Sequence, residues 1–205
     1  MMEALIRFAR DRRIPATRIV ALALLSLILV TDHSWERYGL LDLVIEFSGF
    51  VLIGICTFGR LWSSLYISGF KERRVVTEGP YSMVRHPLYF FSFLGAIGIG
   101  LAAENILVLA VLVLLFVFYY PFVILGEEKK LIDLHGEDYL KYMETTPRFL
   151  PKLSLLSEPE LYPVDSRRYR SAFFDAMWFF WFFMILQIVE RLRFLGWLPV
   201  LFRVP

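Results

Sequence analysis

The chain has 205 residues, of which 58% are hydrophobic and 17% aromatic, and its formal net charge is +2. A soluble domain of this length would be far more polar, so we expect an integral membrane protein with several membrane passes. The small net charge argues against nucleic acid as a partner. Cys56 is the only cysteine and the three histidines lie far apart in the sequence, so an intrachain disulfide is impossible and no metal site is expected.

Apolar segments dominate the chain and predict an all-α, polytopic helical bundle with about five transmembrane helices. In chain order they are Ala16–Val30, Leu41–Ile67, Leu88–Ala103, Ile106–Leu125 and Ala172–Val189. No small-residue cleavage site follows the first segment, so we interpret it as a membrane helix rather than as a signal peptide.

The third and fourth segments are predicted to form a transmembrane hairpin. A membrane-spanning helix needs roughly 17–25 apolar residues, so the third segment is short. Only Glu104 and Asn105 separate it from the fourth segment. Pro121, near the end of the fourth segment, predicts a kink.

Lysine and arginine are concentrated on one side of these segments. Seventeen of the 22 fall in residues 1–18, 70–87 and 126–171, whereas residues 31–40 and 104–105 contain only Arg37. The positive-inside rule therefore places the N-terminus and the long polar loops in the cytoplasm. Phe194–Phe202 is too short to span alone and is either an interfacial helix or a re-entrant return.

A first polar cluster precedes the third apolar segment, at residues 78–89. Gly79 and Pro80 predict a turn, and Pro87 predicts the start of a helix, where its missing amide proton has no cost. Tyr81, Arg85, His86 and Tyr89 would then gather at the membrane surface. They form either part of a ligand site or a capped helix with an aromatic anchor.

A second polar cluster follows the fourth apolar segment and contains Glu127, Glu128 and His135. Gly136 is expected to end that helix with a left-handed cap, and a further helix is expected over residues 137–143. A hairpin would bring both clusters to the same membrane face, where a carboxylate suits a cationic ligand group. Adjacent carboxylates at this position could instead simply be solvated.

Arg60 lies inside the second apolar segment. An arginine at mid-bilayer costs about 2.5–3.5 kcal/mol on insertion scales, so it usually faces protein or water. Arg60 either reaches the cytoplasmic surface or holds an anionic group of a substrate. Asp175 and Gln187, in the last segment, are interpreted as helix–helix hydrogen-bonding residues.

These motifs together resemble the isoprenylcysteine carboxyl methyltransferases and their phospholipid-methylating relatives. The similar stretch runs from about Leu65 to Pro151 and carries Gly-Pro-Tyr, Arg-His-Pro-Leu-Tyr, Glu-Glu, Gly-Glu-Asp-Tyr and Pro-Arg-Phe-Leu-Pro. We expect residues 65–151 to form the methyltransferase core, residues 1–64 the first two membrane helices, and residues 152–205 a linker, the last membrane helix and the tail.

The resemblance implies S-adenosylmethionine as cofactor, in a cytoplasm-facing pocket, and a lipophilic acceptor that enters from the bilayer. Glu127 would pair with the cofactor's ammonium group, His86 or Arg85 would hold its carboxylate, and Tyr81 and Tyr89 would offer aromatic faces. The implied cofactor-binding residues are Arg74, Val75, Val76, Tyr81, His86, Pro87, Leu88, Tyr89 and Glu127.

The sequence predicts the residues that bind the methyl acceptor less completely than those that bind the cofactor. The prenylcysteine enzymes carry an arginine a few residues before the acidic pair, and residues 121–126 of this chain contain none. Arg60, Arg85 or Arg148 could replace it, and His135 or Glu128 could act as the base for an acceptor that must lose a proton.

Two other functions stay open on the sequence alone. Membrane sterol reductases share an Arg-His-Pro-x-Tyr cluster and use NADPH, although they tend to carry Asn where Leu88 stands, and a phosphate-rich cofactor would be repelled by Glu127 and Glu128. A non-enzymatic membrane scaffold or transporter subunit is the other possibility.

Overall fold

The computed structural model of the chain describes residues 19–33, 39–198 and 202–204. Residues 1–18 and Arg37, which enter the charge argument above, lie outside the described residues, as do the start of the first predicted segment and part of the predicted tail.

Most of the described residues are helical. The helices are Ile19–Val30, α2 (Leu40–Ile67), α3 (Pro80–Met83), α4 (Pro87–Ala102), α5 (Ile106–Phe118), α6 (Tyr120–His135), α7 (Glu137–Thr145), the 3-10 turn η1 (Leu153–Leu155) and α8 (Ser166–Phe194). Two three-residue strands, β1 (Thr31–His33) and β2 (Phe202–Val204), pair in parallel. The all-α prediction is confirmed apart from this strand pair.

Three helical units are long and apolar enough to cross a membrane: α2, the continuous stretch Ile106–His135 that contains α5 and α6, and α8. The helix Ile19–Val30 and α4 are apolar but shorter. With 16 residues, α4 is only ~24 Å long. The chain is therefore an integral membrane protein by composition and helix length, but the predicted count of five spanning helices is not confirmed.

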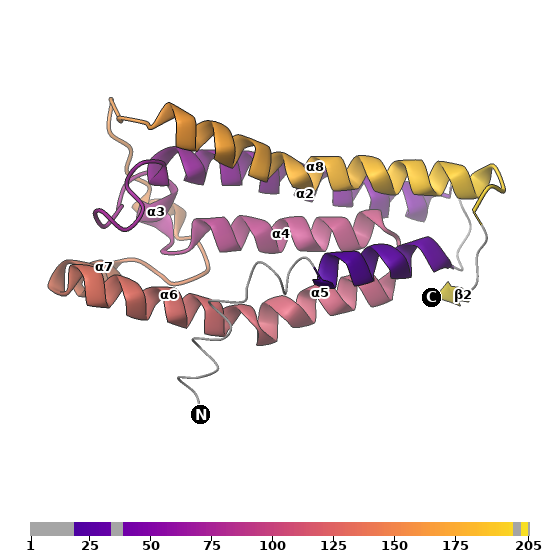
Figure 1. Cartoon of the computed structure of the whole chain (residues 1–205), viewed down its shortest axis with the longest axis horizontal. Helices are drawn as coiled ribbons and strands as arrows, with labels where there is room; N and C mark the ends of the chain where they lie inside the picture. Colours follow the sequence, from indigo (N-terminus) through magenta and orange to yellow (C-terminus); the bar gives the residue numbers. More distant parts are fainter. Residues whose placement is uncertain (1–18, 34–38, 199–201, 205) are drawn as a thin grey trace.

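The long helices run roughly along one axis (Figure 1). Helix α4 packs against both α2 and α8 on one side, and α5 returns along its other side. Helices α3 and α7 lie at one end of the bundle with the polar loops, and β2 lies at the opposite end (Figure 1). The two polar clusters of the sequence are thus brought to the same end.

Small residues allow α2 and α4 to pack closely. A Cβ atom added at Gly49 would lie 2.7 Å from the Ala102 nitrogen and 2.8 Å from the Gly98 carbonyl oxygen, so only glycine fits there. Small residues at such crossings are typical of membrane helices, because van der Waals contact rather than water exclusion drives their association.

Capping side chains define where two of the long helices begin. Asn105 accepts hydrogen bonds from the Leu107 and Val108 amides at the start of α5, and Asp165 does the same at the start of α8. Pro121 lies in the first turn of α6, directly after α5 ends, so the helix assignment is interrupted close to the position of the predicted kink.

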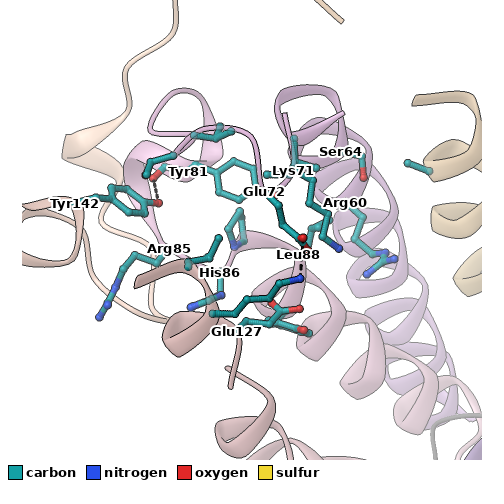
Figure 2. Close-up of a pocket in the computed structure, with 18 of the residues that line it drawn as sticks. Arg60, Ser64, Lys71, Glu72, Tyr81, Arg85, His86, Leu88, Glu127 and Tyr142 are labelled. Carbon is teal, nitrogen blue, oxygen red and sulfur yellow. Dashed lines mark hydrogen bonds and ion pairs between the residues drawn. The ribbon is translucent and has the colours of Figure 1, made fainter. Parts of the chain in front are cut away.

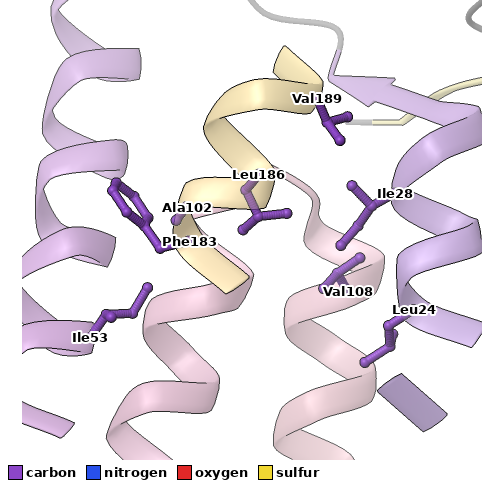
Figure 3. Close-up of a cluster of buried hydrophobic side chains, with 8 residues drawn as sticks. All are labelled: Leu24, Ile28, Ile53, Ala102, Val108, Phe183, Leu186 and Val189. Atoms are coloured by element: carbon purple, nitrogen blue, oxygen red, sulfur yellow. The ribbon is translucent and has the colours of Figure 1, made fainter. Parts of the chain in front are cut away.

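The largest buried apolar cluster lies away from the polar loops and joins the helix Ile19–Val30 to α2, α4, α5 and α8 (Figure 3). Its members are Leu24, Ile28, Ile53, Ala102, Val108, Phe183, Leu186 and Val189. This cluster holds the helices together at one end and leaves the other end available for a site.

Candidate active site

The short helix α3 is fixed by the turn that precedes it. Gly79 has φ +59°, and a Cβ atom there would lie 2.3 Å from the Tyr66 ring, so both conformation and space require glycine. The Gly79 amide donates to the Ser157 carbonyl oxygen over 2.8 Å, and the Ser157 amide donates to Ser82 Oγ over 2.9 Å. The Tyr142 hydroxyl donates to the Tyr81 carbonyl oxygen over 2.7 Å, which ties α7 to α3.

Residues 157–162 are hydrogen-bonded to the C-terminal end of α2. The Glu158 carboxylate accepts hydrogen bonds from Trp62 Nε1 and from the Tyr66 hydroxyl, over 3.0 and 2.9 Å. The Tyr162 hydroxyl donates to the Tyr66 carbonyl oxygen over 2.7 Å. This segment therefore fastens the loop that follows α7 to a helix almost a hundred residues earlier in the chain.

Glu128 is the centre of a buried ionic cluster beneath the loops. Its carboxylate lies 2.9 Å from Arg85 Nη1, 3.2 Å from His86 Nε2 and 3.1 Å from Arg148 Nη2. The side chains of Glu128, Arg85 and His86 are 4%, 8% and 5% exposed, whereas that of Arg148 is 49% exposed. The Arg85 amide also donates to the Pro147 carbonyl oxygen, over 2.9 Å. Glu128 thus holds the first polar cluster against the second.

A cavity of about 610 Å³ opens beside this ionic cluster. It lies within the ~300–1,000 Å³ typical of cofactor and ligand sites. Its walls come from α2, the loop 68–79, α3, α4, α6, α7 and α8. Figure 2 shows Arg60 and Ser64 on one side of it, Tyr81 and Tyr142 on the other, and Glu127 below.

Most of the residues predicted for the site line this cavity. They are Arg60, Arg74, Val75, Val76, Tyr81, Arg85, His86, Pro87, Leu88, Tyr89 and Glu127. Glu127, His86 and Tyr89 therefore face one common space. Glu128, His135 and Arg148 do not line it: Glu128 and Arg148 belong to the ionic cluster, and His135 is the last residue of α6. The catalytic roles assigned to these three stay predictions.

Two cations of the cavity wall, Lys130 and Arg74, are paired with carboxylates. Lys130 Nζ lies 2.7 Å from the Glu72 carboxylate, and this ion pair joins α6 to the loop 68–79. Glu72 has φ +63°, a conformation that residues with a side chain rarely adopt. Arg74 pairs with Glu78 over 3.1 Å and donates to the Tyr162 hydroxyl over 2.9 Å.

Aromatic rings form much of the remaining wall. The Tyr89 ring lies edge-on to Tyr120, with centroids 5.5 Å apart, and the Tyr120 ring stacks on Phe116 at 4.1 Å. Burial raises the pKa of Tyr139 and of Tyr142. Both hydroxyls therefore stay protonated at neutral pH, and that of Tyr142 donates its proton to the Tyr81 carbonyl oxygen.

Sequence reasoning missed several cavity residues: Ser64, Ile67, Lys71, Glu72, Ser92, Tyr120, Lys130, Leu131, Tyr139, Tyr142, Ala172 and Asp175. For two of them a signal existed. Lys130 and Leu131 follow Glu127 by three and four residues, so they share its helical face. Asp175, interpreted from the sequence as a helix–helix hydrogen-bonding residue, instead lines the cavity.

The sequence pattern of the phospholipid methyltransferases matches residues 40–138, which include α2 to α6 and the first residues of α7. This match covers just under half of the chain and includes most of the residues that line the cavity.

Two relatives match most of the chain, and the chain belongs to their family. The chain is 36% identical to the nickel-cobalt-cadmium resistance protein NccN of Alcaligenes xylosoxydans xylosoxydans, over 97% of this chain and 92% of that protein. It is also 36% identical to the cobalt-zinc-cadmium resistance protein CzcN of Cupriavidus metallidurans, over 87% of this chain and 82% of that protein. A shorter stretch, 40% of this chain and 34% of the relative, is 30% identical to the protein-S-isoprenylcysteine O-methyltransferase of Schizosaccharomyces pombe. No solved structure matches the chain.

Proposed function

We propose that the protein is an S-adenosylmethionine-dependent methyltransferase that transfers a methyl group to a lipophilic acceptor in the membrane. The observation that carries this proposal is that Glu127, His86 and Tyr89, which come from the two separate family motifs, line one cavity at the polar end of the bundle. The family assignment supports the reaction class, and the apolar exterior supports an acceptor taken from the bilayer.

The residues of the cavity fit the chemical groups of this cofactor. Glu127 would pair with its ammonium group. Arg85 already pairs with Glu128 through Nη1, but its buried Nε lacks a hydrogen-bond partner among the described residues, and Arg85 or His86 would hold the carboxylate. The rings of Tyr81 and Tyr89 would lie against adenine or the sulfonium. When bound, the cofactor supplies an electrophilic methyl group on a positively charged sulfur.

The contribution of the protein to the transfer is mainly alignment. Bringing two reactants into an in-line arrangement contributes about 7–11 kcal/mol in well-oriented systems. The ionic cluster around Glu128 fixes His86, at the start of α4, relative to α6. It therefore keeps the two polar clusters of the site at a constant distance from each other. The aromatic walls also exclude water, which favours the reaction of a cation with an anion.

The need for a base depends on the acceptor. An anionic oxygen needs none, whereas a protonated amine or a phenol has to lose a proton first. For such an acceptor we propose His135 or Glu128 as the base, with Arg60, Arg85 or Arg148 as the residue that holds the substrate.

We further propose that the polar end of the bundle faces the cytoplasm and that α4 and α5 form a transmembrane hairpin. Residues 70–87 and 126–171 contain twelve lysines and arginines, and the turn Glu104–Asn105 contains none. A reporter fused after Pro151 should indicate a cytoplasmic position, and one inserted between Glu104 and Asn105 a position on the opposite side. The reverse pattern would refute this orientation.

Binding of the reaction product, S-adenosylhomocysteine, tests the proposal directly. We expect it to raise the unfolding temperature of the purified protein, and we expect Glu127→Gln to abolish the increase. Glu144→Gln, at an exposed position on α7, is the matched control and should keep the increase. Stabilisation by NADPH instead would favour a reductase, and no response to either ligand would favour a scaffold.

A further inference from the structure

Arg60 differs from the other cavity cations that the structure describes because it lies deep within a membrane helix. It precedes the end of α2 at Ile67 by about two helical turns, or ~10 Å. It is one turn deeper than Ser64, which lines the same wall (Figure 2). Lys71, Arg74 and Lys130, by contrast, belong to the loop after α2 or to the polar part of α6.

The charge of Arg60 has no counter-ion in the described part of the chain. Its Nη1 donates to the neutral hydroxyl of Ser92 on α4, and that hydroxyl donates in turn to the Leu88 carbonyl oxygen. Its guanidinium also lies over the Phe179 ring of α8, 5.5 Å from the centroid. Both contacts hold the guanidinium in place, but neither brings a negative charge to it.

One N–H donor of the Arg60 guanidinium also has no acceptor among the described residues. Its Nε is buried and has no hydrogen-bond partner among the residues described. Asp175 of α8 also lines the cavity, yet no ion pair joins it to Arg60 within the described ranges. A cation in a low-dielectric environment is costly unless an anion or strong acceptors compensate it.

We propose that Arg60, positioned by Ser92 and Phe179, binds an anionic headgroup of the acceptor, a phosphate or a carboxylate. The inference rests on the proposed methyltransferase function and specifies the acceptor: an amphiphile with a negative charge at the depth of Arg60. The site to be methylated on such a molecule would extend from there toward Glu127 and Tyr89, which line the same cavity.

The position of Arg60 supports an amphiphile rather than a soluble anion. The neighbouring surface of α2 is apolar and exposed, with Phe58 75% and Ile55 43% exposed, and so is that of α8, with Trp178 67% exposed. A lipid chain can lie along such surfaces while its headgroup reaches the cavity. A soluble anion would first meet Lys71 and Lys130 at the outer part.

Titration with defined amphiphiles, followed by native mass spectrometry of the purified protein in neutral detergent, tests the inference. The probes are oleate and dioleoyl phosphatidic acid, each paired with an uncharged analogue, oleyl alcohol and dioleoylglycerol. We expect the wild-type protein to bind at least one anionic probe about tenfold more tightly than its analogue. A preference for only one of them identifies the group as phosphate or carboxylate.

Three variants assign the effect to Arg60. Arg60→Gln should reduce the preference to less than about twofold, and Arg60→Lys, which keeps the positive charge but loses the planar guanidinium, should keep only part of it. Arg191→Gln is the matched control, because Arg191 also lies in a long apolar helix and over a phenylalanine ring, but does not line the cavity. It should behave like the wild type. An unchanged preference in Arg60→Gln, or none in the wild type, would overturn the inference.

The response of the wild-type protein to S-adenosylhomocysteine separates this inference from the proposed function. If the product stabilises the protein while the anionic probes show no Arg60-dependent preference, the function stands and the inference fails. If the preference depends on Arg60 but the product has no effect, the anion site stands and the methyltransferase proposal fails.

Discussion

Glu127 and Glu128 are neighbours in the sequence but have different surroundings in the structure. Their glutamine variants should therefore have different effects on stability and on cofactor binding. Glu128 is buried and pairs with Arg85, His86 and Arg148, whereas Glu127 is half-buried and lines the cavity. We therefore expect Glu128→Gln to lower the stability of the unliganded protein, and Glu127→Gln to act mainly on cofactor binding.

The magnitude for Glu128→Gln follows from the burial of its partners. Removing one member of a buried ion pair costs roughly 3–5 kcal/mol, because the other charge is left uncompensated. Arg85 is 8% exposed and meets this condition, whereas Arg148 is half exposed and contributes less than ~1 kcal/mol. Glutamine keeps one oxygen that still accepts a hydrogen bond, so we expect a loss near the lower limit, about 3 kcal/mol.

Thermal unfolding in detergent, followed by the loss of helical circular dichroism, measures this loss. For a chain of about 200 residues, 3 kcal/mol corresponds to a decrease of roughly 6–12 °C in the unfolding temperature. Glu127→Gln should change this temperature by less than half as much and should abolish the stabilisation by S-adenosylhomocysteine. Equal losses in the two variants, or a loss below about 1 kcal/mol for Glu128→Gln, would refute the assignment of Glu128 as the structural centre of the cluster.

Three further predictions concern packing and individual contacts. Gly49→Ala should destabilise the bundle by about 1–3 kcal/mol in the same melting assay, because the added methyl group meets the backbone of α4, whereas Gly54→Ala, on the same helix with no atom within 4 Å of its added Cβ, should be neutral or slightly stabilising. If the two alanine variants melt alike, the close approach of α2 and α4 is wrong. Lys130→Gln should cost less than ~1 kcal/mol, and the loss should decrease further in 0.5 M salt, because both partners of its ion pair are more than two fifths exposed. A large loss that salt does not change would contradict a solvated pair. Tyr142→Phe should cost about 1–3 kcal/mol by denaturant titration, since it leaves the carbonyl oxygen of a residue in α3 without its donor; an unaltered midpoint would show that this bond does not hold α7 in place.

The sequence predicted those features of the fold that depend on local chemistry. Pro87 begins α4 and Gly136 separates α6 from α7, as expected from a missing amide proton and from a positive φ. The membership of the two motifs in one site was also predictable, because they flank two apolar segments joined by a very short turn. Such signals act over a few residues and need no knowledge of neighbouring helices.

The division of roles within the site was not predictable in the same way. Glu127 and Glu128 are about 100° apart on α6, and which of them faces the cavity depends on how the helix is rotated against α4. The contact between Arg60 and Ser92 depends likewise on the register of two helices that are packed through glycine. The rotation and register of packed helices depend on tertiary contacts, and the periodicity of a single segment does not determine them.

The span count shows a further limit of hydropathy. Ala16–Val30 and Leu88–Ala103 were predicted as spans because they are apolar. Within the described residues they correspond to Ile19–Val30, whose preceding residues are not described, and to α4, which is shorter than an independent membrane helix requires. Helix α4 packs against α2, α5 and α8, so its ends need not reach lipid headgroups on their own. Apolar character identifies such a helix, while its depth is set by its neighbours.

The segment 157–162 has a consequence for biosynthesis. Gly79, Trp62 and Tyr66 leave the ribosome about eighty to almost one hundred residues before their partners Ser157, Glu158 and Tyr162. Most of the helices that form the cavity can thus insert and associate before the segment that fastens α2 to the turn at Gly79 has been translated. In a nascent chain that stops short of Ser157, the end of α2 and this turn lack those contacts, so this part of the structure is completed late in synthesis.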